Sequence, residues 1–147
     1  MTSVGIYIDT SALAKRYVAE VGSTEFDDFL AAEEAEFVVS PLVATELESI
    51  LQRLMREARI SAAYAEQARE LFAIDLASAL WSMRPFGASV FAHAAQSMRE
   101  LALPLATLDA LHLACAIELR CEALASGDRR LLAAAAARGL RVHSFVV

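Results

Sequence analysis

Short apolar segments alternate with longer segments of helical periodicity along this 147-residue chain, and this alternation restricts the folds open to it. The first apolar segment, VGIYI at residues 4–8, has no polar face. Strands that are apolar on both faces are typical of a parallel sheet covered by helices on both sides. We expect further strands at 37–39, 79–83, 122–126 and 141–146, and helices at 11–19, 23–34, 41–58, 61–73, 88–102, 107–120 and 129–138. The sequence therefore predicts an α/β fold, a three-layer α/β/α sandwich with a central, mainly parallel sheet of about five strands.

Local signals place several of the helix ends. Thr10 or Ser11 is the expected N-cap of the first helix, because a hydroxyl there can accept a hydrogen bond from a free backbone N–H. Ser40 followed by Pro41 predicts another helix start, with serine as the cap and proline at the first helical position. Gly139 is the expected C′ residue of the last helix, where a left-handed conformation suits glycine.

Length and composition bound the class of protein. We expect residues 1–147 to form a single domain. The sequence has neither an apolar run long enough to span a membrane nor the layout of a signal peptide, which predicts a cytoplasmic protein without a membrane partner. A net charge of −6 argues against a broad basic face for nucleic acid, although the arginines are locally clustered. Cys115 and Cys121 fit no zinc-binding pattern, and we interpret both as structural.

Four acidic residues occupy positions that suggest chemistry. Asp9 directly follows the first strand, and Asp128 follows the strand at 122–126. Ligand sites in open α/β sheets lie beyond the carboxyl ends of the strands, so these two acids should face one crevice. Glu46 and Asp109 each lie in a helix beside apolar neighbours, where a carboxylate is costly unless a cation or hydrogen-bond donors meet it.

Carboxylates that converge in one cleft repel one another, and a bound cation relieves the repulsion. An all-oxygen ligand set suits Mg²⁺, with Mn²⁺ as a substitute. Such an ion can activate water and stabilise the charge that develops during phosphodiester hydrolysis. We therefore interpret Asp9 as a metal ligand. His112, one turn after Asp109, is predicted to be a buried or supporting residue.

Four segments, in order, resemble the motifs of PIN-domain nucleases, and in particular of the VapC-type toxins of bacterial toxin–antitoxin pairs. They are YIDTSALAKRYVAEVGS with Asp9, SPLVATELESIL with Glu46, LPLATLDALHLACAIEL with Asp109, and LASGDRRLLAAAAARGLRV with Asp128. The resemblance implies an endoribonuclease whose four acids form a Mg²⁺ or Mn²⁺ site. It also implies an RNA substrate, a homodimer and a cognate antitoxin that blocks the active-site groove.

The remaining residue assignments concern support and RNA contact. Ser126 stands where the family commonly has a small hydroxyl residue, and we assign it and Thr10 supporting roles. The candidates for contact with RNA phosphate are Arg129, Arg130, Lys15 and Arg16. The helices within 41–73 are candidates for dimer and antitoxin contacts, with packing in the core as the equal alternative.

Other functions also place an aspartate after a first strand. Phosphatases and dehalogenase-like hydrolases need a second acid two residues on, where this chain has Ser11. A receiver-type domain needs a late lysine, and the single lysine here is Lys15. The main alternative is a catalytically weak or noncatalytic module that keeps the fold and binds RNA or a protein partner.

Overall fold

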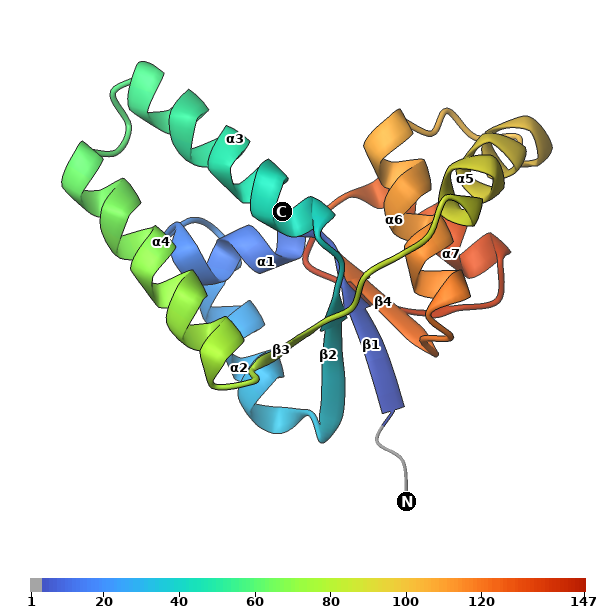
Figure 1. The fold of residues 1–147 in the computed structure, drawn as a ribbon, viewed down its shortest axis with the longest axis horizontal. Coiled ribbons are helices and arrows are strands. Elements are labelled where there is room, and N and C mark those ends of the chain that lie inside the picture. Colours follow the sequence, from blue (N-terminus) through green and yellow to red (C-terminus); the bar gives the residue numbers. More distant parts are fainter. Residues whose placement is uncertain (1–3) are drawn as a thin grey trace.

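The computed structural model describes residues 4–147, in which five parallel strands form one sheet with helices on both faces (Figure 1). The strands are β1 (Val4–Ile8), β2 (Ala35–Val39), β3 (Trp81–Met83), β4 (Ala123–Ser126) and β5 (Arg141–Ser144). The helices are α1 (Thr10–Tyr17), α2 (Ser23–Ala32), α3 (Leu42–Arg56), α4 (Ala62–Ala77), α5 (Ser89–Glu100), α6 (Thr107–Glu118) and α7 (Arg129–Ala137). The predicted three-layer α/β/α fold is confirmed.

The strand order is β3-β2-β1-β4-β5, which puts the first strand of the chain at the centre of the sheet. The chain moves outward from β1 through β2 to β3, and then returns to the other side of β1 as β4. The strand order therefore reverses between β1 and β4, where Ile8 pairs with Ala125. In sheets of this kind a ligand site lies beyond the carboxyl ends of the two strands at the reversal.

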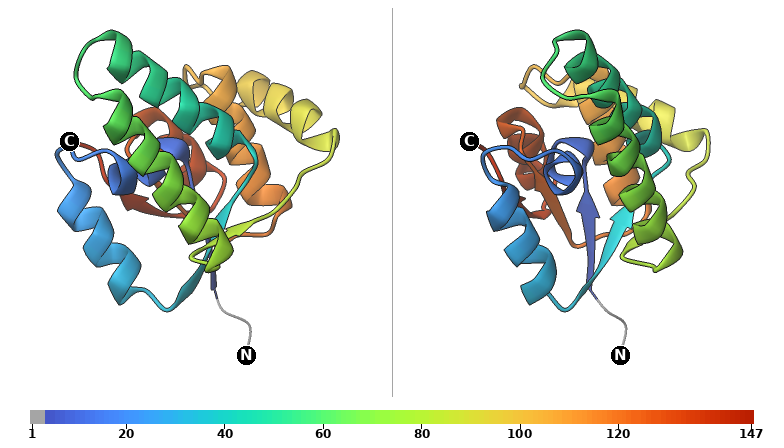
Figure 2. Two further views of the ribbon diagram at one scale, coloured as in Figure 1. Left: turned by 60° about the vertical axis from the view of Figure 1, so that its left-hand side comes forward. Right: turned by 90° about the vertical axis from the view of Figure 1, so that its left-hand side faces the viewer.

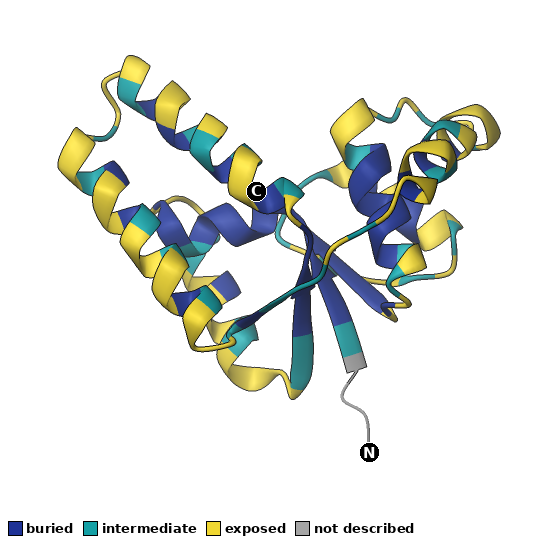
Figure 3. Cartoon of the chain, in the orientation of Figure 1, coloured by how far each residue is buried: buried dark blue, intermediate teal, exposed yellow. Residues whose placement is uncertain are grey.

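Two apolar cores cover the two faces of the sheet. Helices α1–α4 lie on one face and α5–α7 on the other (Figure 1). Successive side chains of a strand point to opposite faces, so Ile6 and Ile8 enter the first core while Tyr7 enters the second. Figure 3 shows the result, with the central strands buried and the exposed residues on the outer faces of the helices.

Helices α3 and α4 form an antiparallel pair that extends to one side of the sheet (Figure 2). The apolar residues of the α3 segment LESILQRLM point inward, because Leu47, Leu51 and Leu54 are all buried in the first core. Packing in the core therefore explains most of the hydrophobicity of α3. On α4, Leu71 and Ile74 remain exposed.

Two of the predicted caps were wrong. The α1 cap is Asp9, whose carboxylate accepts a hydrogen bond from the Ala12 N–H at 2.9 Å, and Thr10 is already helical. At the start of α3 the Ser40 hydroxyl makes no capping bond, because it lies 2.9 Å from the phenol oxygen of buried Tyr7. Gly139 has a φ of +87°, which confirms the left-handed C′ position.

Element boundaries were otherwise close to those expected. The largest difference is that α4 continues to Ala77, and every other boundary lies within two residues of the expected one. Cys115 and Cys121 are both buried and unpaired, in keeping with structural roles. Among the helices of residues 4–147, none combines the length and the apolar character needed to cross a membrane.

Candidate active site at the carboxyl ends of the strands

Asp9 is the most buried acid of the site, with 2% of its surface exposed. Its carboxylate accepts hydrogen bonds from the Ser126 hydroxyl at 2.6 Å, from the Ser11 hydroxyl at 2.8 Å and from the Ala12 N–H. Burial raises the pKa of Asp9, and these donors together with His112 only partly oppose that effect. Asp9 is thus held in one orientation by groups from both α1 and β4.

Ser126 links Asp9 to the fourth acid. It is the last residue of β4 and is fully buried. While its hydroxyl donates to Asp9, its oxygen accepts a hydrogen bond from the Asp128 N–H at 2.9 Å. The Asp128 carboxylate accepts hydrogen bonds from the Arg130 and Leu131 N–H groups, which makes it the N-cap of α7. Ser126 thus contacts both acids, and its supporting role in the site stays a prediction.

Glu46 lies on α3 and is oriented by two polar side chains. Thr10 donates its hydroxyl hydrogen to the carboxylate at 2.8 Å, and His112 Nε2 lies 2.5 Å from the same oxygen. Burial alone would raise the pKa of Glu46, but the contacts with His112 and Thr10 outweigh it and lower the pKa. Thr10 therefore supports Glu46 as well as beginning α1.

His112 connects Glu46 to a buried hydroxyl chain. Its Nδ1 lies 2.6 Å from the Tyr7 phenol oxygen, which in turn lies 2.9 Å from the Ser40 hydroxyl. With its proton on Nε2, the ring donates to Glu46 and leaves Nδ1 to accept from Tyr7. The Tyr7 and His112 rings are almost completely buried, so these hydrogen-bonded side chains can hold Glu46 in place without solvent. The expected supporting position of His112 agrees with this arrangement.

Asp109 lies in the first turn of α6 and is partly buried. Burial raises its pKa to about 6, and the negative charges of Asp128, Asp9 and Glu46 contribute in the same direction. Asp109 is therefore within electrostatic range of three carboxylates that are distant from it in the sequence. A cation at this edge of the sheet would relieve the repulsion.

The carboxylates are not arranged as a finished ligand set. Within residues 4–147 no group of three or more His, Cys, Asp or Glu side chains is placed to hold a metal ion. Asp9, Glu46 and Asp128 each accept hydrogen bonds from donors of the protein itself. The oxygen-only donors suit a hard cation in their chemistry.

The basic residues near the site differ in their surroundings. The Lys15 side chain is 5% exposed, with its amine 3.3 Å from Glu20 and 3.0 Å from the Val21 carbonyl oxygen. Arg16 forms a two-point contact with Asp75 and so already has a partner. Arg129 and Arg130 are exposed at the start of α7, directly after Asp128. RNA contact by these four residues stays a prediction, and the exposed pair is free to make it.

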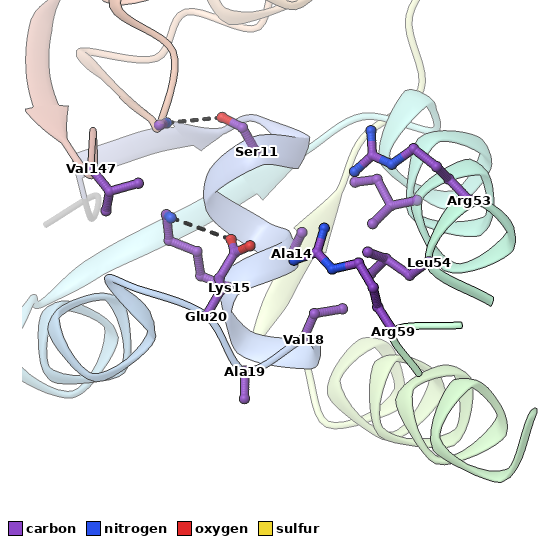
Figure 4. A pocket seen from close by; sticks show the side chains of 12 residues that line it. Ser11, Ala14, Lys15, Val18, Ala19, Glu20, Arg53, Leu54, Arg59 and Val147 are labelled. Carbon is purple, nitrogen blue, oxygen red and sulfur yellow. Dashed lines mark hydrogen bonds and ion pairs between the residues drawn. The ribbon is translucent and has the colours of Figure 1, made fainter. Parts of the chain in front are cut away.

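Two hollows adjoin the acids along α3. One, of about 350 Å³, contains Glu46 and is otherwise mostly apolar, with Leu42, Ile50 and Leu108 in its lining. The other, of about 360 Å³, lies between α1 and the end of α3 (Figure 4). It contains Ser11, to which the sequence analysis assigned no role in the site, although its spacing of two residues from Asp9 could have indicated the contact.

The protein is thus of the α/β class, with a parallel sheet covered by helices on both faces and acidic residues where the strand order reverses. The PIN domain family model matches residues 6–137, and the chain belongs to that family. No protein with curated annotation matches the chain.

Several solved structures share the fold. VapC20 of Mycobacterium tuberculosis, described as a sarcin-ricin loop cleaving toxin, is 20% identical with a TM-score of 0.70, over 88% of this chain and 94% of that one. VapBC2 of Rickettsia felis, bound to a DNA fragment from its promoter, is 15% identical with a TM-score of 0.67, over 95% and 98% of the two chains. FitAcB of Neisseria gonorrhoeae is 16% identical with a TM-score of 0.67, over 95% and 97%.

Proposed function

We propose that this protein is a metal-dependent endoribonuclease and the toxin of a toxin–antitoxin pair. The observation that carries the proposal is the convergence of Asp9, Glu46 and Asp128 on Asp109 at one edge of the sheet, where burial, with their charges adding to it, raises the pKa of Asp109 to about 6. The likeness of the fold to VapC20, which is described as a sarcin-ricin loop cleaving toxin, supports the same proposal.

In this mechanism the four carboxylates would hold Mg²⁺, or Mn²⁺ in its place. The bound ion would supply an activated water and would stabilise the charge that develops on the phosphate and the leaving oxygen. Asp9 would be kept in position by Ser126 and Ser11.

Glu46 on α3 and the two arginines at the start of α7 would complete the site. Thr10 and His112 orient the Glu46 carboxylate, so its direction is already restricted before substrate binds. Arg129 and Arg130 would contact the RNA backbone, since guanidinium groups pair well with phosphate. Such contacts position the strand and do not select its sequence.

The partners implied by this function are RNA, a cognate antitoxin and a second copy of the chain. A solved structure with this fold, from Klebsiella pneumoniae, is described as a toxin–antitoxin complex, which supports the proposal of an antitoxin. Sedimentation of the purified protein across a range of concentrations would test the homodimer, and a single monomeric species throughout would contradict it.

The test is cleavage of total cellular RNA by the purified protein in Mg²⁺, in EDTA and as the Asp9→Asn variant. We expect discrete products in Mg²⁺ and a loss of about 100-fold or more in the other two cases, because stabilisation by the metal contributes several kcal/mol. Mapping the ends of the products would identify the RNA.

A matched pair of variants on α3 sharpens the test. Glu46→Gln removes a site carboxylate, while Glu48→Gln removes a carboxylate that pairs with Arg69 outside the site. Cleavage should fall only in the first variant. Equal activity of Asp9→Asn and the parent protein would refute the nuclease assignment.

A catalytically weak module that binds RNA or a partner is the second candidate. It is favoured by one observation, that Asp9, Glu46 and Asp128 already have hydrogen-bond donors within the protein and form no ready metal group among the described residues. This function predicts that Mg²⁺ leaves the melting temperature unchanged and that RNA stays intact in every reaction.

A further inference from the structure

The hollow between α1 and the end of α3 is positively charged. Its volume is about 360 Å³, and its lining includes three cationic side chains, Lys15, Arg53 and Arg59, against one acidic side chain, that of Glu20 (Figure 4). Val147, the last residue of the chain, also lines it. The chain as a whole carries a net charge of −6. A cationic hollow on an acidic protein is a specific local feature that the overall charge does not explain.

The two arginines are the cations that are available to a ligand. Lys15 is paired with Glu20 at 3.3 Å. Arg53 is exposed and forms no ion pair within residues 4–147, and Arg59 has only a 3.6 Å contact with Glu57 in which both side chains are exposed. Exposed pairs of this kind are weak, so Arg59 can exchange its partner for a stronger one.

This hollow shares a wall with the acid site. Ser11 lines it (Figure 4). The Ser11 hydroxyl donates to the Asp9 carboxylate at 2.8 Å and accepts a hydrogen bond from the Gly127 N–H at 2.8 Å. Gly127 also belongs to the lining, and the next residue is Asp128. A ligand in the hollow would therefore lie directly beside the proposed metal ligands, separated from Asp9 by one serine.

We propose that this hollow is a subsite for a phosphate of the RNA strand next to the phosphate that is cleaved, with Arg53 and Arg59 as its donors. Arginine presents a planar set of N–H groups that matches phosphate oxygens, and such charge-assisted contacts are stronger than neutral ones. The inference rests on the proposed function, because it takes the acid edge as the place where the scissile phosphate binds. It adds two residues that the analysis of the sequence did not assign to RNA.

The test uses RNA binding rather than cleavage. A fluorescein-labelled single-stranded RNA of 12 nucleotides and mixed sequence is titrated with Asp9→Asn protein in Mg²⁺, between 50 and 200 mM salt. The double variant Arg53→Gln/Arg59→Gln is compared with Arg56→Gln, which removes an exposed arginine of α3 that does not line the hollow. All three residues are exposed, so the variants should fold normally.

Loss of one phosphate contact should reduce the slope of log K against log salt concentration by about 0.7, the value for single strands. We expect this change, with a loss of affinity of about tenfold at 50 mM salt, in the double variant and not in Arg56→Gln. Equal slopes for the two would overturn the proposal, and so would the absence of RNA binding by the parent protein. A tenfold loss that appears only with a 5′-phosphorylated RNA would also overturn it, because the hollow would then take a chain end.

Failure of this inference and failure of the proposed function give different results. Metal-dependent cleavage with unchanged binding by the double variant would leave the nuclease standing and remove the subsite. RNA binding that depends on Arg53 and Arg59 in a protein that never cleaves RNA would leave the phosphate-binding hollow standing and remove the nuclease. It would then support an RNA-binding module.

Discussion

Replacement of Asp75 by asparagine should destabilise the protein more than any comparable change at its surface. Asp75 of α4 is 4% exposed and accepts hydrogen bonds from Arg16 Nε at 2.7 Å, from Arg16 Nη2 at 3.0 Å and from the Tyr17 hydroxyl at 2.5 Å. Tyr17 in turn accepts the indole N–H of Trp81 at 2.6 Å. The network therefore joins α1, α4 and β3 through one carboxylate.

The expected cost follows from burial and from what asparagine retains. Removal of one partner from a buried ion pair typically costs about 3–5 kcal/mol. The Arg16 side chain is 27% exposed and also lies 3.7 Å from Asp27, so water and this second carboxylate offset part of the lost contact. The asparagine oxygen can also still accept a hydrogen bond from Tyr17. We therefore expect Asp75→Asn to lower the free energy of unfolding by about 2–3 kcal/mol, with the melting temperature falling by about 4–12 °C.

Urea unfolding followed by circular dichroism measures the effect, with Glu48→Gln as the control. Glu48 and Arg69 make the same two-point contact, at 2.7 and 2.8 Å, but their side chains are 45% and 34% exposed. The geometry of the two pairs is thus matched while burial differs. Exposed pairs contribute little to stability, so the control should unfold close to the parent protein.

The difference between the parent and Asp75→Asn should also depend on pH with a definite sign. Contacts with Arg16 and Tyr17 outweigh burial and lower the pKa of Asp75. Its contribution is therefore complete above the unfolded pKa of about 3.9 and is lost as the pH falls through the lower folded value. Equal destabilisation by Asp75→Asn and Glu48→Gln at pH 7 would refute the argument from burial, and a difference that grew on acidification would refute the assigned pKa.

Two further predictions concern the acid site. Asp109→Asn should stabilise the protein in EDTA by about 1–2 kcal/mol at pH 8. Burial and nearby carboxylates raise the pKa of Asp109 to about 6, so its charged form disfavours the fold. The gain should vanish below about pH 4, and a difference in melting temperature that stayed constant across this range would contradict the argument. Tyr7→Phe should cost about 1–3 kcal/mol, since it leaves Ser40 and His112 without their shared partner in a buried site; denaturant unfolding measures the loss, and a variant as stable as the parent would contradict the role of this hydroxyl.

Much of the architecture was predictable from local features of the chain. The apolar segments without a polar face indicated a parallel sheet, since strands buried on both sides have no solvent-facing positions. The placement of Asp9 after β1 and Asp128 after β4 was also local, because the carboxyl ends of parallel strands meet at one edge. These features depend on short stretches of sequence, and the structure agrees with them.

The wrong caps show where local reasoning stops. Ser40 has the ideal sequence context for an N-cap, yet its hydroxyl is used by Tyr7 of a neighbouring strand. The pairing of β1 with β2 brings the two residues together, and no propensity of the Ser40-Pro41 step contains that information. Asp9 is the cap of α1 because it lies at the end of the central strand β1, where its side chain reaches the Ala12 N–H.

The sequence by itself determined the alternating α/β pattern and the four acids, because a strand, a helix start and the residue after them are set by neighbouring positions. Only the tertiary structure decided which side chains form hydrogen bonds with those acids and which arginines remain free of ion pairs among the described residues. His112 reaches Glu46 across 66 positions, Arg16 is taken by Asp75 across 59, and Arg53 is left facing the hollow beside Ser11. Such contacts depend on how helices pack across the sheet, and sequence distance carries no record of that packing.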